Sequence, residues 1–226
     1  MSHDQSTHIC LVLDRSGSMQ AVHADALGSV NSYVQAAKQG RALYEAKFSL
    51  ITFNSEGIHT IRQNEMMETV RPMNSEEYRC SGLTPLYDAI GRGIGTLDEV
   101  LAGKTGDKAI LVVMTDGHEN ASNEFSHATI SKLIKARQEQ GWLITFLGAD
   151  LSVAEQGIQL GAHGHYVARF SGSKGLRAAG RVLASSSARF VQSADAGVTR
   201  RERAILREGD DELSKHLQEV QHGEKE

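Results

Sequence analysis

A short apolar run, followed at once by a polar loop and a helical pattern, constrains this chain most. Residues 9–13 are all apolar, which predicts a strand buried on both faces. The loop Asp14-Arg15-Ser16-Gly17-Ser18 comes next, and apolar residues then recur at helical spacing from Val22 to Ala37, so we expect a helix from about Met19. A strand, a tight loop and a helix form the first unit of an open α/β sheet, where ligands bind beyond the carboxyl ends of the strands.

Side chains that carry oxygen alternate along this loop. Asp14, Ser16 and Ser18 can therefore face one point, and Gly17 permits the tight turn between the two serines. A cluster of oxygen ligands with low formal charge suits a hard divalent cation such as Mg²⁺. Serine and aspartate are also common helix N-caps, so the loop alone leaves a simple capping role open.

A second apolar run ends in a similar way. Residues 109–114 predict another buried parallel strand, and Thr115-Asp116-Gly117 follows it. Parallel strands end at the same edge of a sheet, so we expect the carboxylates of Asp116 and Asp14 to lie at one edge.

A third segment lies between these two. Ser81-Gly82-Leu83-Thr84-Pro85-Leu86 precedes a helical pattern. Thr84 as the N-cap and Pro85 as the first helical residue fit the chemistry of a helix start.

Together, the three segments resemble the metal-ion-dependent adhesion site of von Willebrand factor type A domains. The resemblance implies that one Mg²⁺ or Mn²⁺ is bound by Asp14, Ser16, Ser18, Thr84 and Asp116. Family members more often carry two glycines before the threonine, so Leu83 departs from the pattern. The resemblance covers roughly residues 7–195, and it looks most like the small, single-domain intracellular type of bacteria and their phages.

The rest of the chain continues the alternation of strands and helices. The turn at residues 54–57 predicts a hairpin, whose second strand runs antiparallel to the first. We expect an α/β, doubly wound, mostly parallel six-stranded sheet with one antiparallel edge strand and helices on both faces. The further strands are predicted near 44–53, 58–63, 142–147 and 166–168, and the further helices near 86–101, 130–137, 153–160 and 176–190. Gly91, Gly93 and Gly95 lie inside a helical pattern, which favours close helix packing over a phosphate-binding loop.

Two parts are expected: an A domain at residues 7–195 and a charged C-terminal extension at 196–226. The extension begins with arginines, turns acidic after Gly209 and carries only a thin apolar stripe. Two interpretations stay open, a frayed tail and a helix that docks on a charged surface.

Composition narrows the function. The net charge of −4 gives no sign of a nucleic-acid partner. No apolar stretch approaches the roughly 18 residues of a membrane span, and residues 1–8 lack an apolar signal core. Only two cysteines are present, Cys10 and Cys80, so we expect a reduced chain in the cytoplasm.

The resemblance to A domains implies a metal-dependent protein–protein interaction module. Its Mg²⁺ would keep an open position that an aspartate or glutamate of a partner protein completes. A metal-dependent hydrolase or phosphoryl-transfer enzyme is one alternative, and a self-assembling structural protein is another. The first loop carries a single aspartate and no nucleophile–base pair is visible, so we expect no enzymatic activity. His118 and Glu119 beside the site belong to a solvated loop or to a rim that contacts the partner.

Overall fold

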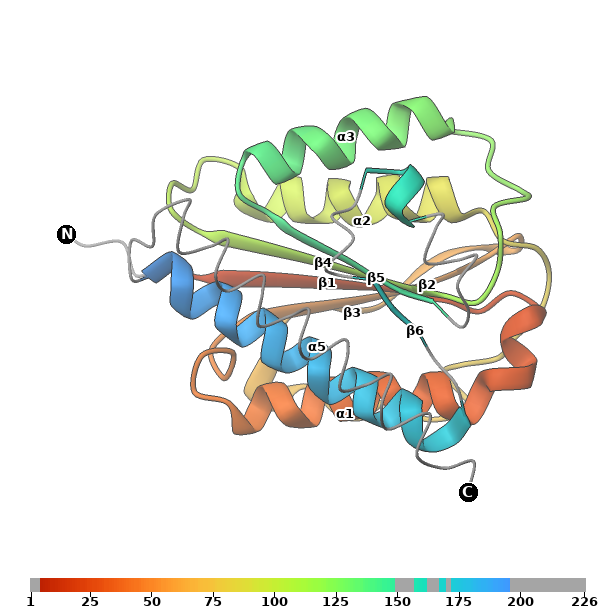
Figure 1. Cartoon of the computed structure of the whole chain (residues 1–226), viewed down its shortest axis with the longest axis horizontal. Coiled ribbons are helices and arrows are strands. Elements are labelled where there is room, and N and C mark those ends of the chain that lie inside the picture. The colour runs from red at the N-terminus through yellow and green to blue at the C-terminus, as the bar shows by residue number, and fades with distance from the viewer. Residues whose placement is uncertain (1–4, 149–156, 162–166, 170–171, 196–226) are drawn as a thin grey trace, which may run out of the picture.

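A mostly parallel β-sheet forms the centre of the molecule (Figure 1). The computed structural model describes residues 5–148, 157–161, 167–169 and 172–195. The strand order is β3-β2-β1-β4-β5-β6. The strands are β1 (Thr7–Asp14), β2 (Lys47–Asn54), β3 (Gly57–Met66), β4 (Lys108–Thr115), β5 (Leu143–Gly148) and β6 (Val167–Arg169).

Only β3 runs antiparallel to its neighbour among the described strands. It pairs with β2 through the predicted hairpin turn, whereas every other described pair is parallel. Strands β1 and β4 lie in the middle of the sheet and are apolar because helices cover both of their faces. The predicted α/β class and the antiparallel edge strand are therefore confirmed.

Helices cover both faces of the sheet, as predicted. Figure 1 shows α2 (Leu86–Leu101) and α3 (His127–Glu139) on one face, and α1 (His23–Gln39) and α5 (Gly172–Asp195) on the other. Two apolar clusters fill the two spaces. One contains Ile9, Leu11 and Leu13 of β1, and the other contains Cys10 and Val12, as the alternation of side chains along a strand requires.

Two glycines allow close helix packing. A Cβ at Gly93 of α2 would lie 2.7 Å from Val12 Cγ2, so the helix approaches β1 closely and the predicted packing role is confirmed there. A Cβ at Gly180 of α5 would lie 2.2 Å from the carbonyl oxygen of Ser29 in α1. The long C-terminal helix is thus seated directly on the backbone of α1.

Element boundaries differ from the predictions in three places. A 3₁₀ turn at Ser18–Val22 precedes α1, β2 begins at Lys47 rather than at 44, and β3 extends to Met66 where a loop was expected from Asn64. The extension of β3 depends on pairing between Met66 and Lys47, a tertiary contact with no trace in the local sequence. Residues 153–156, half of the predicted helix at 153–160, and all of residues 196–226 lie outside the described residues.

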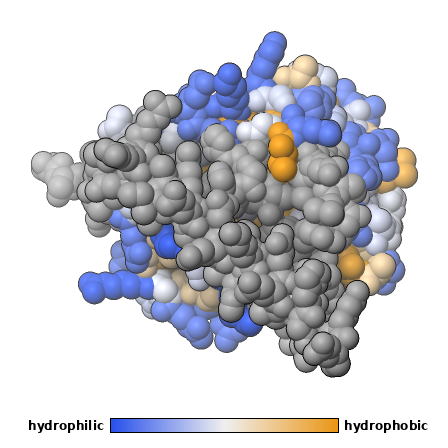
Figure 2. Space-filling model, in the orientation of Figure 1, coloured by the Kyte–Doolittle hydropathy of each residue, from blue (hydrophilic) through white to orange (hydrophobic). Residues whose placement is uncertain are grey.

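The visible surface of the described residues is mainly hydrophilic. Figure 2 shows isolated apolar residues among polar ones on this face. The large apolar side chains exposed in the described part of the chain are Tyr44, Leu83 and Ile158. None of the described helices combines the length and the apolar character that crossing a membrane requires.

Candidate metal-binding site

The register of the two central strands places Asp14 beside Thr115. Leu13 pairs with Met114, so the next residue of each strand lies at the carboxyl edge of the sheet. The hydroxyl of Thr115 donates a hydrogen bond to one carboxylate oxygen of Asp14 (2.5 Å), and the backbone N–H of Ser16 donates to the other (2.6 Å). Asp14 is completely buried, and these two donors satisfy its carboxylate.

The two serines and Asp116 form a continuous oxygen chain. The hydroxyl oxygens of Ser16 and Ser18 are 3.1 Å apart, and the hydroxyl of Ser18 donates to the carboxylate of Asp116 (2.7 Å). Alternate residues of the first loop therefore face one point, as predicted. Asp116 follows the last residue of β4, so it reaches the site from one residue beyond the position of Asp14 on β1.

Thr84 joins this cluster through its hydroxyl. A Cβ at Gly117 would lie 3.0 Å from the Thr84 hydroxyl oxygen and 3.3 Å from the Ser18 hydroxyl oxygen, so both oxygens converge on one small space. Thr84 itself is only 3% exposed. The structure thus brings together all five residues that the sequence singled out.

The alternative role of Thr84 as a helix cap is wrong. Helix α2 begins at Leu86 with Pro85 at the N-cap position, and the N–H groups of its next two residues donate to the side chains of Glu119 and Ser122 rather than to that of Thr84. Asn120 binds the backbone of Thr84, because its side-chain oxygen accepts a hydrogen bond from the Thr84 N–H (2.8 Å) and its own N–H donates to the Thr84 carbonyl (3.2 Å). This pair of bonds holds Thr84 against the loop that follows β4.

The site concentrates negative charge in a partly dry environment. Burial raises the pKa of Asp14 from 3.8 to about 6, and the charge of Asp116 adds to this shift, whereas hydrogen bonds from Thr115 and Ser16 oppose it. No group of three or more His, Cys, Asp or Glu residues suited to a metal occurs within the described ranges. The ligands here would be three hydroxyls and two carboxylates, an all-oxygen set that fits Mg²⁺ or Mn²⁺ and not a soft metal.

Comparison with known families agrees with this geometry. The family model of the von Willebrand factor type A domain matches residues 8–177, well over half of the chain. The chain belongs to this family. The sequence matches none of the curated proteins with which it was compared.

Several solved structures share the fold of this A domain. The pilus adhesin SpaC from Lactobacillus rhamnosus GG, in its open conformation, is 13% identical with a TM-score of 0.65, over 85% of this chain and 31% of the adhesin. The vWF domain of the type V pili tip protein Mfa5 from Porphyromonas gingivalis is 12% identical with a TM-score of 0.55, over 88% of this chain and 98% of that one. Proximal thread matrix protein 1 from the mussel byssus is 16% identical with a TM-score of 0.56, over 80% of this chain and 47% of that one. At these identities the likeness establishes the fold alone.

Glu119 of the A domain organises a loop. Its carboxylate accepts hydrogen bonds from the N–H groups of Tyr87, Ala121 and Ser122 and from the Ser122 hydroxyl. Asp88, in the first turn of α2, holds the next part of the same loop, because its carboxylate accepts hydrogen bonds from the N–H groups of residues 123–125. The sequence does not distinguish Glu119 and Asp88 from solvent-exposed acidic residues. Hydrophobic periodicity therefore could not reveal that they bind the backbone of a loop. His118 is exposed on the same loop.

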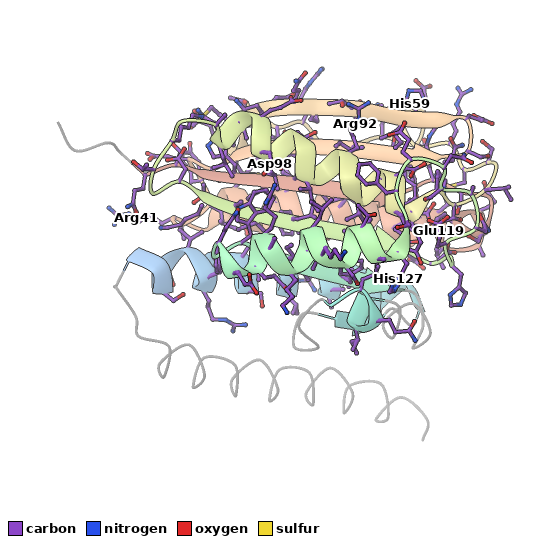
Figure 3. The ribbon with its side chains drawn as sticks, turned by 90° about the horizontal axis from the view of Figure 1, so that it is seen from above. Arg41, His59, Arg92, Asp98, Glu119 and His127 are labelled. Atoms are coloured by element: carbon purple, nitrogen blue, oxygen red, sulfur yellow. The ribbon has the colours of Figure 1, made fainter. Side chains whose placement is uncertain are left out.

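The described residues also form a hollow far from the candidate metal site. It has a volume of about 610 Å³ and is lined where β1, β2 and β4 begin and α5 ends. Arg41, which lines it, lies at the opposite end of the molecule from Glu119 (Figure 3). Its lining mixes lysine and arginine with glutamate, so its charges select no ligand class.

Proposed function

We propose that this A domain recognises an acidic side chain of a partner protein through a bound Mg²⁺ or Mn²⁺. Domains of this family typically act in protein interaction and adhesion. The observation that carries the proposal is the convergence of Ser18, Thr84 and Asp116 around one small space, with Ser16 and Asp14 directly behind.

The residues present fit such an ion. The hydroxyls of Ser16, Ser18 and Thr84 and the carboxylates of Asp14 and Asp116 would hold it at the carboxyl edge of the sheet. Only two ligands carry charge, so the bound cation would keep a strong attraction for a further carboxylate. Charge-assisted contacts of this kind gain strength where water is partly excluded.

A titration tests the metal first. We expect calorimetry to show one ion bound at millimolar or lower Mg²⁺, with a rise in melting temperature, because a ligand that binds only the folded state stabilises it. Asp116→Ala removes a ligand and should abolish both effects. Asp98→Ala is the matched control, since it also removes one carboxylate. Asp98 is bonded to Arg137 (2.7 Å) and lies in α2, well away from Glu119 beside the site (Figure 3). Loss of binding in both variants, or no binding in the wild type, would contradict the metal site.

A second measurement tests the acidic partner. A short peptide with one glutamate, and its glutamine counterpart, are titrated into the protein with Mg²⁺ and with EDTA, and amide NMR shifts are followed. We expect binding only for the glutamate peptide and only with Mg²⁺. Equal binding in EDTA would refute metal-bridged recognition.

The enzyme alternative is disfavoured by the local hydrogen bonding. The carboxylate of Glu119 is already an acceptor for four donors, so it is badly placed to act as a general base. A phosphatase and nucleotidase panel with Mg²⁺ decides this point, and turnover that Asp14→Ala abolishes would establish an enzyme. A self-assembling protein would instead form oligomers on a sizing column that EDTA leaves intact.

The cytoplasmic location and the bacterial or phage type remain predictions. Both described cysteines are free, which agrees with a reducing compartment.

A further inference from the structure

We propose that Asn54 positions the loop that carries Thr84 and thereby sets the affinity of the site for its metal. Asn54 lies at the end of β2, outside the five candidate ligands, and its side chain is almost completely buried. The inference rests on the proposed function, because it concerns the same metal.

The Asn54 side chain makes four hydrogen bonds with three segments. Its amide group donates to the carbonyl (2.9 Å) and to the hydroxyl (3.1 Å) of Ser81. Its oxygen accepts from the guanidinium of Arg15 (3.0 Å) and from the N–H of Glu56 (3.0 Å). Asn54 therefore connects three segments: the first metal loop (residues 14–18), the β2–β3 turn, and the segment before α2 that carries Thr84 (residues 70–85), which we call the Thr84 loop.

The next residue adds a second connection between the same segments. The N–H of Ser55 donates to the carbonyl of Leu83 (3.0 Å), and the hydroxyl of Ser55 accepts from the N–H of Leu83 (2.9 Å). Gly82 fits against this hydroxyl in a left-handed conformation (φ 72°), where a Cβ would lie 2.4 Å from the Ser55 oxygen. Leu83, which replaces the glycine more common in the family, fits here because its backbone is held by Ser55 while its side chain is 54% exposed.

Such connections matter because the Thr84 loop lacks regular structure. Residues 70–85 contain no helix or strand, so the burial of Val70, Met73 and Tyr78 and hydrogen bonds to neighbouring segments hold them in place. Backbone bonds from Gly17 to Gly82 (2.9 Å) and from Ser81 to Arg15 (2.9 Å) then align this loop with the first metal loop. Removing the Asn54 side chain would leave the Ser81 carbonyl without this donor and would free the loop to move.

Asn31 offers a matched control. It also ties a loop to the domain, since its amide group donates to the Met73 carbonyl (2.9 Å) and its oxygen accepts from the Met73 N–H (2.8 Å). It lies in α1 and holds the same 70–85 segment at Met73, eleven residues before Thr84, whereas Asn54 holds that segment at Ser81, three residues before Thr84. We compare Asn54→Ala and Asn31→Ala with the wild type, measuring Mg²⁺ affinity by calorimetry and the melting temperature in EDTA.

We expect Asn54→Ala to weaken Mg²⁺ binding at least tenfold, while Asn31→Ala binds Mg²⁺ like the wild type despite a similar loss of melting temperature. Unchanged affinity in Asn54→Ala, or an equal loss in Asn31→Ala, would overturn the inference. If Asn54→Ala does not fold, Ser55→Ala replaces it, because Ser55 is exposed. Ser55→Ala should also weaken Mg²⁺ binding. Wild-type Mg²⁺ affinity in Ser55→Ala would then refute the role of these residues in positioning the Thr84 loop.

Hydrogen exchange in EDTA separates this inference from the proposed function. The amides of Ser55 and Leu83 should exchange faster in Asn54→Ala than in the wild type, whereas amides of α3 should not change. If the wild type binds no Mg²⁺, the proposed function fails and the metal part of the inference fails with it. The exchange rates then still decide whether Asn54 holds the loop, and unchanged rates refute that role.

Discussion

At the scale of single residues, Asp14 connects the fold to the site. Its carboxylate is buried between the Thr115 hydroxyl and the Ser16 N–H, and its carbonyl accepts a hydrogen bond from the Tyr78 hydroxyl (2.7 Å). Burial makes the charged form costly, which is why its pKa is raised to about 6. A bound metal ion would offset the cost of burying the charged carboxylate. Without the metal, this cost lowers the stability of the folded protein at neutral pH.

Asp14→Asn should therefore stabilise the metal-free protein. Because the folded pKa lies above the ordinary value of 3.8, the folded state binds the proton more tightly than the unfolded state. The resulting penalty grows as the pH rises from about 4 to about 6 and is complete above that. Removing it is worth at most about 3 kcal/mol at pH 7. We expect melting in EDTA to rise by a few degrees at pH 7 and to match the wild type near pH 4.

The same variant should lose its response to Mg²⁺, because an amide is a poorer ligand than a carboxylate. Melting curves with and without Mg²⁺, at both pH values, check both effects. A metal-free variant that melts below the wild type at pH 7 would mean that the hydrogen bonds of the carboxylate outweigh the cost of burying its charge.

At the scale of elements, the contact between α1 and α5 holds the C-terminal part of the domain. The close approach at Gly180 places the α5 backbone against the carbonyl of Ser29, and the Tyr33 hydroxyl bonds to the Ser187 hydroxyl (3.1 Å). Leu183 and Val191 of α5 are buried in the cluster beneath α1. These contacts make α5 an integral layer of the domain.

Gly180→Ala should destabilise the protein although alanine favours helices. The added Cβ meets backbone atoms of α1 that cannot move alone, so the helices must separate at a cost of about 1–3 kcal/mol. Gly95→Ala in α2 is the matched control, since nothing lies within 4 Å of its added Cβ. That variant should gain about 0.5–1 kcal/mol from helix propensity. Urea unfolding measures both, and a stabilised Gly180→Ala would show that the two helices are not in close contact.

At the scale of the whole molecule, the described domain contains the complete candidate site. The five candidate ligands lie at the end of β1, in the loops that follow β1 and β4, and in the segment that precedes α2. The apolar stripe of the extension at 196–226 has only four residues, Leu206 before Gly209 and Leu213, Leu217 and Val220 after it. An isolated helix of that kind is marginal in water.

Deleting residues 200–226 should leave Mg²⁺ affinity and the melting temperature nearly unchanged. A chain that ends at residue 187 is the contrasting variant, because it also removes Val191, which is buried in the core. We expect the second truncation to melt many degrees lower. If the first truncation aggregates or melts as low, the extension belongs to the core, and the domain boundary near 195 is wrong.

The sequence by itself determined the order of the described strands and helices along the chain and the class of the sheet, and its resemblance to A domains implied the five candidate ligands. Buried parallel strands must be apolar runs, and the residues directly after them must lie at the carboxyl edge, so Asp14 and Asp116 could be placed from local pattern. The β2–β3 hairpin followed from a short turn in the same way.

Only the tertiary structure decided which neighbours hold that site in shape. Asn54, Ser55, Asp88, Glu119 and Asn120 act through hydrogen bonds to backbone groups in other segments. Such bonds leave no periodic trace, because a polar residue in a loop looks the same whether it faces water or a distant N–H. Local sequence likewise suggested Thr84 as a helix cap, a role that the start of α2 at Leu86, with Pro85 at the N-cap position, rules out.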